Sequence, residues 1–361
     1  MVQLLRWWMT PSPQPKPPPD FTAEALSKVD EIVERLEVVQ TGWADGAFLE
    51  GHIQITVDGV YELPTDVREQ ILEHQKDKWI EDGFRDNVQL GVRKLSIIRE
   101  TDEPIRDIAH RIVITAHAFR YLESKATNFE WLAGSSQNVL GKYFSDATQD
   151  HHAHAMPTPL SVGLSLFCEG GRKLVLVRRT KNKAAGGHIA GGKITNAVGE
   201  NCAPIDCESS RGDKVHLSVF RTAARGLLEE MGLDRSQISV SLLHTLCWDK
   251  KMCDYKFFGL AISPLSDREV EYFWDRAPDK GESAKFKTGR LMVLDVETRA
   301  AATGVVADIL RNKDEWSFEA RQSTIMSLLQ MHRINKDDLV AAAQAYDLKD
   351  KKESLTPSVG S

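Results

Sequence analysis

The chain has 361 residues, of which 42% are hydrophobic and 27% are charged, and its formal net charge is −6. This composition is typical of a globular protein, and no apolar run reaches the ~20 residues that a membrane-spanning helix needs. The negative charge argues against a general nucleic-acid coat protein, and the length favours two domains of ordinary size over one large core.

The first 20 residues are rich in proline. Six prolines lie between Pro11 and Asp20, which predicts a stiff, extended segment. The residues before it contain no long apolar core and no clear cleavage site, so a signal peptide is not expected.

Residues 21–150 predict a small α+β accessory domain. Asp20 can cap an amphipathic helix through Val39, residues 52–63 predict a hairpin that turns at Asp58-Gly59, and Thr65 can begin a helix to about Trp79. Strands are expected at residues 92–99 and 111–115, with a helix following over residues 116–124. This domain could position a substrate, form a homodimer or contact another protein.

The sequence contains a histidine cluster and five cysteines, and neither set is expected to bind a metal. The segment His151-His152-Ala153-His154 lies between polar residues and prolines, which indicates an exposed linker between domains. The five cysteines have loose spacings and an odd count, which favours a reducing, cytoplasmic compartment over disulfides or a zinc site.

A hairpin opens the second predicted domain, residues 158–333. Leu160–Cys168 and Arg172–Arg179 alternate as strands around the turn Glu169-Gly170-Gly171. The second strand leads into Arg178, Arg179 and Lys181, a run of cations that can bind phosphate.

A helix follows whose last turns carry Arg225, Glu229 and Glu230. Arg225 and Glu229 are four residues apart and can pair on one face, and Gly232 suits a left-handed residue that ends the helix. Two carboxylates on one helix edge, together with a third from a loop, suit a hard cation such as Mg²⁺.

The remaining chain predicts three strands and three helices. The strands are at residues 238–248, 255–262 and 290–296, and the helices are at residues 295–311, 317–332 and 337–348. Residues 334–361 are therefore expected to form one short helix and then a disordered tail from Lys349.

The run Arg225-Gly-Leu-Leu-Glu-Glu-Met-Gly-Leu233, with Gly192 and Glu200 upstream, resembles the signature of the Nudix hydrolases. Seven residues separate Gly192 from Glu200 where the family pattern has five, and 24 separate Glu200 from Arg225 where it has seven. The excess includes the polar segment Cys202–Lys214, which is expected to be an inserted surface loop. At Gly226 the family usually has a glutamate.

The resemblance implies an α/β/α Nudix sandwich with a mixed sheet and a pyrophosphohydrolase activity on a nucleotide or another nucleoside-diphosphate derivative. It implies that Glu200, Glu229 and Glu230 hold Mg²⁺ or Mn²⁺, with Glu229 and Glu230 also in the catalytic set. Arg225 would orient these glutamates, and Arg178, Arg179 and Lys181 would bind the substrate phosphates. Glu282, in a later polar loop, would belong to the catalytic set as well, and as a ligand or general base it would replace the carboxylate missing at Gly226.

Two other functions stay open. One is a catalytically weak Nudix module that senses a nucleotide or serves as a platform for protein interaction, and Gly226 is the residue that supports it. The other is isomerisation of an isoprenoid diphosphate, which would need a catalytic cysteine near the metal, and no cysteine has a convincing position for that role.

Overall fold

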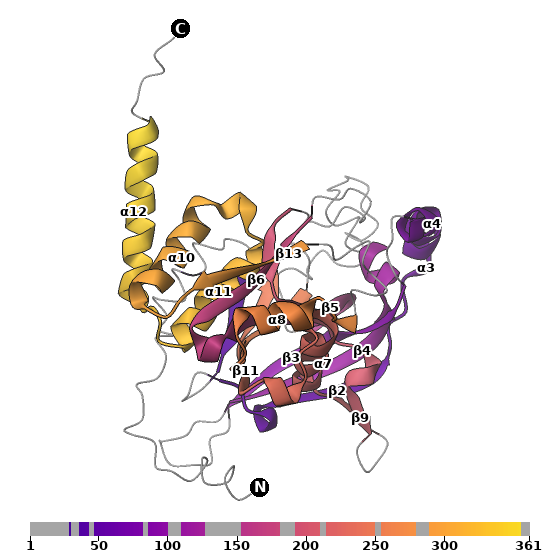
Figure 1. Cartoon of the computed structure of the whole chain (residues 1–361). Coiled ribbons are helices and arrows are strands. Elements are labelled where there is room, and N and C mark those ends of the chain that lie inside the picture. Colours follow the sequence, from indigo (N-terminus) through magenta and orange to yellow (C-terminus); the bar gives the residue numbers. More distant parts are fainter. Residues whose placement is uncertain are drawn as a thin grey trace, which may run out of the picture.

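The computed structural model describes residues 29, 36–42, 47–81, 86–99, 110–126, 153–180, 192–209, 214–249, 254–278 and 289–354. Predictions on the proline-rich segment, on Lys181 and on Glu282 lie outside these residues. Within the described ranges the chain is a mixed α/β protein, with seven α-helices and a mixed sheet of 13 strands (Figure 1). The α/β class predicted from the sequence is confirmed.

The sheet is continuous, in the order β1-β11-β12-β5-β3-β4-β2-β10-β9. Strand β5 also pairs with β6 and β8, while β6 pairs with β7 and β13. The pairs β12–β5 and β2–β4 are parallel, and the other pairs are antiparallel. The strands are β1 (Leu36–Thr41), β2 (Ile53–Val60), β3 (Val88–Arg99), β4 (His110–Arg120), β5 (Ala153–Cys168), β6 (Lys173–Arg179), β7 (Ile194–Asn196), β8 (Val198–Asn201), β9 (Cys207–Ser209), β10 (Val215–Leu217), β11 (Val240–Asp249), β12 (Asp254–Ile262) and β13 (Gly289–Asp295).

Helices cover both faces of the sheet. Helices α10, α11 and α12 gather at one end of the molecule, and α4 lies at the opposite end (Figure 1). The helices are α3 (Thr65–Val67), α4 (Glu73–Glu81), α7 (Val219–Met231), α8 (Asp267–Trp274), α10 (Arg299–Arg311), α11 (Phe318–Gln330) and α12 (Lys336–Ser354).

The alternation of side chains along β5 divides the hydrophobic core in two. Leu160 and Leu164 belong to the first core, which the sheet forms with α7 and α8. Phe167 belongs to the second core, which the sheet forms with α10, α11 and α12, and the Ser165 hydroxyl meets that of Ser323 in α11 at 2.8 Å. The long strand β5 is thus buried on both faces.

The N-terminal strands join this sheet directly. Gly91 of β3 pairs with Pro159 of β5, and Val92 pairs with Thr158. Leu90 and Ile112, from β3 and β4, belong to the same first core as Leu160. The sequence predicts separate domains at residues 21–150 and 158–333. In the structure, strands of the two segments are hydrogen-bonded to each other and share a hydrophobic core.

Three predicted elements of the N-terminal segment are wrong. Residues 36–39 were expected in a helix but lie in β1, which pairs with β11. Residues 53–60 form one strand rather than a hairpin, because Gly59, with φ of 77°, lies at a break in the register between β2 and β4 instead of in a turn. Residues 116–120 continue β4, and helical residues begin only at Tyr121.

Other predicted elements are confirmed within a few residues, namely the strands β3, β6, β11, β12 and β13 and the helices α10 and α11. Helix α12 continues to Ser354, so the expectation of disorder from Lys349 is wrong for its first residues. Ala153 and His154 begin β5 and are not a linker, whereas His151 and His152 lie outside the described residues. Among the helices described, none has the length and apolar character needed to cross a membrane.

Candidate functional site

Helix α7, which carries the predicted carboxylates, begins and ends as its sequence indicates. The Ser218 hydroxyl caps its start by accepting a hydrogen bond from the Arg221 backbone N–H. Gly232 ends it with φ of 69°, where the Gly232 and Leu233 N–H groups bond to the carbonyls of Leu228 and Leu227. This end of α7 fixes where Glu229 and Glu230 emerge.

Gly226 lets α7 lie directly against β8. A Cβ atom at this position would lie 2.6 Å from Cγ1 of Val198 and 3.1 Å from Cβ of Glu200. Both residues belong to β8, and Val198 is fully buried. The position therefore has no room for the glutamate that the family usually carries, and the glycine serves the packing of helix on strand.

Arg225 is the centre of an ion-pair network. Its Nη1 lies 3.0 Å from Oε1 of Glu200 and 3.1 Å from Oε2 of Glu229. Its Nε and Nη2 bind the two carboxylate oxygens of Asp206 at 2.9 and 3.0 Å, and Nη2 also donates to the Asn201 carbonyl at 2.8 Å. These contacts use all five N–H groups of a guanidinium. The predicted pairing of Arg225 with Glu229 is confirmed.

Asp206 is the residue that the sequence did not reveal. Its side chain is only 2% exposed, and Oδ2 also accepts from the Ala203 N–H at 3.0 Å and the Thr222 hydroxyl at 2.9 Å. Asp206 lies in the segment Cys202–Lys214, between a buried Cys202 and the strand β9. The expectation of a surface loop is therefore wrong for this part of the insertion, which contributes to the core and to the sheet.

The surroundings of Arg225 keep its charge in place. Burial alone would lower the pKa of the guanidinium, but the hydrogen bonds that it donates to Asp206 and the charge of Glu200 raise its pKa above the ordinary value. Arg225 is 15% exposed, compared with 18% for Glu200 and 34% for Glu229. The network is thus closed at Asp206 and open to solvent at Glu229.

Glu230 adjoins the same strand. Its Oε1 accepts a hydrogen bond from the Gly199 N–H at 3.0 Å, one residue before Glu200 in β8. The structure therefore brings Glu200, Glu229 and Glu230 to one contact between α7 and β8. In the described part of the chain, no group of three or more His, Cys, Asp or Glu side chains is already arranged to hold a metal.

Of the predicted phosphate-binding cations, Arg178 lies away from these carboxylates, and Lys181 lies outside the described residues. Along β6, Leu174 and Leu176 face the second core, and Arg178 continues that face, where it forms an ion pair with Glu315. Helix α7 lies on the other face. Arg179 follows Val177 on the first-core face, and its backbone N–H binds the Lys193 carbonyl. Arg178 thus has a carboxylate partner on the face opposite to Glu229.

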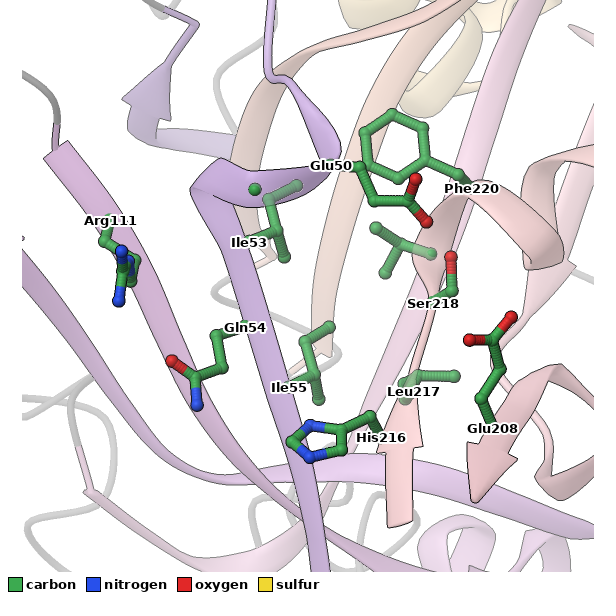
Figure 2. Close-up of a pocket in the computed structure, with 12 residues that line it drawn as sticks. Glu50, Ile53, Gln54, Ile55, Arg111, Glu208, His216, Leu217, Ser218 and Phe220 are labelled. Atoms are coloured by element: carbon green, nitrogen blue, oxygen red, sulfur yellow. The ribbon is translucent and has the colours of Figure 1, made fainter. Parts of the chain in front are cut away.

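A separate pocket of about 370 Å³ lies at the first turn of α7 (Figure 2). Since α7 rises 1.5 Å per residue, the pocket is roughly 16 Å along the helix from Glu229. It is therefore not part of the carboxylate network. Its lining comes from the 3-10 helix Glu50–His52, from β2, β4, β9 and β10, and from the start of α7. It includes Glu50, Ile53, Gln54, Ile55, Arg111, Glu208, His216, Leu217, Ser218 and Phe220.

Comparison with known proteins assigns no family. No family model matches the chain, and no curated protein matches it either.

Proposed function

We propose that this protein is a divalent-metal-dependent hydrolase that cleaves a diphosphate linkage in a nucleotide or another nucleoside-diphosphate derivative. The observation that carries the proposal is the assembly of Glu200, Glu229 and Glu230 where α7 meets β8. Glu200 comes from β8, and Glu229 and Glu230 are neighbours in α7, and the Nudix-like spacing anticipates that they act together.

The donor chemistry suits Mg²⁺ or Mn²⁺, because carboxylate oxygens are the ligands that these hard cations prefer. Glu200, Glu229 and Glu230 would hold the ion at the solvent-exposed side of the network. Glu229 and Glu230 would also take part in catalysis. When bound, the ion would neutralise charge on the diphosphate and make a water molecule more acidic.

Arg225 would fix the directions of Glu200 and Glu229 through the hydrogen bonds described above. Of the three cations expected to bind phosphate, Arg179 is the one whose described position lies on the α7 face of the sheet. Arg178 would not bind the substrate, because it forms an ion pair with Glu315 on the opposite face.

The test is a product-identified screen of the full chain with Mg²⁺ or Mn²⁺. Substrates would include ADP-ribose, NAD, dinucleotide polyphosphates, nucleoside triphosphates and sugar nucleotides. Glu229→Gln and Glu230→Gln should each lower turnover by about 100-fold or more, because each removes a charge that would hold the metal. Glu271→Gln is the matched control, since Glu271 is exposed on α8, and it should leave turnover unchanged.

Equal turnover of the wild type and both α7 variants at saturating metal would exclude these glutamates from the mechanism. Metal-independent turnover would contradict the proposal as well.

A second candidate is a module that binds a nucleotide with little or no turnover. The observation that favours it is the close contact at Gly226, which leaves no space for the fourth carboxylate of the family pattern. Clear nucleotide binding in calorimetry, combined with no turnover on any diphosphate of the screen, would select this candidate over the hydrolase.

A further inference from the structure

Asp206 contacts Arg225 in a different way from Glu200 and Glu229. It is almost fully buried and binds Arg225 through both oxygens, whereas Glu200 and Glu229 each make one contact at the more open side. A buried carboxylate that also accepts hydrogen bonds from Ala203 and Thr222 has no free direction toward a solvent-exposed metal. Asp206 is therefore placed to act on Arg225 rather than on a metal.

The bidentate contact has two physical consequences. It fixes the plane of the guanidinium, because two parallel N–H···O bonds allow a single orientation, and it thereby directs Nη1 toward Glu200 and Glu229. The buried Asp206 carboxylate also offsets the positive charge of Arg225. Without Asp206, the same guanidinium would be balanced only by Glu200 and Glu229, and it would compete with a metal for their charge.

We propose that Asp206 is a positioning residue for the metal site, which orients and neutralises Arg225 so that Glu200 and Glu229 keep negative charge for a divalent cation. This inference rests on the proposed function and extends it to an insertion that the Nudix pattern does not contain. The insertion thus supplies the carboxylate that offsets the positive charge of Arg225. Arg225 can then orient Glu200 and Glu229 without cancelling their attraction for a cation.

The experiment measures Mn²⁺ binding to the full, metal-free chain by paramagnetic resonance, with no substrate present. Asp206→Asn removes the charge and keeps an oxygen that can accept from Ala203 and Thr222. It should weaken Mn²⁺ binding by about 10–100-fold, because Arg225, which contacts the proposed ligands Glu200 and Glu229, loses both its orientation and its counter-charge.

The matched control is Glu208→Gln, which removes a carboxylate from the same insertion. Glu208 is 60% exposed and pairs with Arg221 at 3.0 Å, not with Arg225. Because solvent and salt screen such a pair, the control should change Mn²⁺ affinity by about twofold or less. Equal affinities for Asp206→Asn and Glu208→Gln would overturn the inference.

A double variant separates positioning from simple loss of structure. Asp206→Asn combined with Arg225→Gln removes the competing cation together with its counter-charge, so Mn²⁺ should bind more tightly than to Asp206→Asn. Affinity should stay below the wild-type value, because Glu200 and Glu229 lose the hydrogen bonds that orient them. A merely structural role predicts that the double variant binds as weakly as Asp206→Asn or more weakly, and this result would also overturn the inference. If Asp206→Asn alone does not fold, the double variant carries the test, since it leaves no buried charge without its partner.

The outcomes distinguish this inference from the proposed function. A wild type that binds no Mn²⁺ and turns over no diphosphate would overturn both. A wild type that binds Mn²⁺ and turns over substrate, together with an Asp206→Asn variant of unchanged affinity, would overturn only the role of Asp206.

Discussion

Gly226 is a glycine inside α7 that lies directly against β8. The glycine lies within a helix, where it costs about 1 kcal/mol relative to alanine. A Cβ atom there would lie 2.6 Å from Cγ1 of Val198 in β8, so the Val198 side chain would have to shift to accept it. The cost of glycine in the helix is thus offset by the close approach of helix and strand, which brings Glu229 and Glu230 next to Glu200.

A pair of glycine-to-alanine variants tests this balance. Gly226→Ala should destabilise the protein by about 1–2 kcal/mol, because an overpacking cost of about 1–3 kcal/mol exceeds the helix-propensity gain. Gly304→Ala is the matched control. Gly304 lies in α10 with nothing near its Cβ position, so its alanine variant should gain up to about 1 kcal/mol.

Urea unfolding of both variants measures the difference. If Gly226→Ala proved as stabilising as Gly304→Ala, the glycine would not be needed for packing, and a larger side chain could be accommodated there. Gly226→Glu should be more destabilising than Gly226→Ala, since it adds length in the same direction.

Contacts of the candidate site between residues close in the sequence can be predicted, whereas contacts between residues far apart in the sequence cannot. The spacing of Arg225 and Glu229 predicts their ion pair, because residues four apart on a helix are neighbours. Asp206 has no such signal, since its polar surroundings in the sequence resemble a solvated turn. Only the three-dimensional contact with Arg225 shows that it is buried. Likewise, the cluster of cations suggests phosphate binding, but strand alternation directs Arg178 to Glu315 on the other face.

At the scale of elements, His244 connects β11 to α11 on the side of the sheet that faces the second core. Its ring is fully buried, with Nδ1 2.8 Å from the Thr245 hydroxyl and Nε2 3.1 Å from the Ser327 hydroxyl. Burial lowers the pKa of His244 to about 3. The link between strand and helix therefore depends on a neutral imidazole.

This histidine makes stability depend on pH in a defined direction. The unfolded chain binds a proton at His244 below pH 6.5, whereas the folded chain does not until about pH 3. The folded state should therefore lose about 1.4 kcal/mol per pH unit between these values as the pH falls. Asp254 acts in the opposite sense, because burial raises its pKa and protonation then favours the folded state.

His244→Gln isolates the histidine contribution, because Asp254 is the same in both proteins. Between pH 7.5 and pH 5, the variant should lose about 2 kcal/mol less stability than the wild type in urea unfolding. His74→Gln, which changes an exposed ring on α4, is the control and should follow the wild-type curve. Parallel pH curves for His244→Gln and the wild type would contradict a buried neutral imidazole.

Elements with a strong local pattern are predictable, and elements that depend on distant partners are not. Alternating strands such as β6 and capped helices such as α10 follow from neighbouring residues alone. By contrast, β1 is a strand because β11 pairs with it from some 200 residues away. Helix α8 was missed although Ser266 and Glu269 form a capping box, a signal that the sequence contains.

At the scale of the whole molecule, β5 joins the N-terminal strands to the rest of the sheet. It pairs with β12 along one edge, while β3 and β8 pair with successive stretches of its other edge and β6 pairs with its last residues. The first core extends across this joint, from Ile112 to Leu227. A loss of packing at β5 should therefore destabilise both the N-terminal strands and the rest of the sheet.

Leu160→Ala tests this coupling. Leu160 is fully buried in the first core, so the cavity should cost about 2–5 kcal/mol. Hydrogen exchange should show a similar loss of protection in β3–β4 and in β11–β12, because both share the damaged core. Leu228→Ala, at an exposed position of α7, is the control and should cost less than about 0.5 kcal/mol. A loss confined to β11–β12 would indicate that the N-terminal strands unfold independently.

The parallel pairing of β5 with β12 also affects the order in which the protein can be made. Leu160 of β5 must wait for Tyr255, some 95 residues later in the chain, before that pairing can begin. At typical rates of ribosomal synthesis this interval is roughly 5–20 s. During that time β3 can already pair with β5, but the edge of β5 that β12 will occupy has no strand beside it. The nascent chain therefore passes through a period in which its central strand exposes unpaired backbone N–H and C=O groups, which favour aggregation.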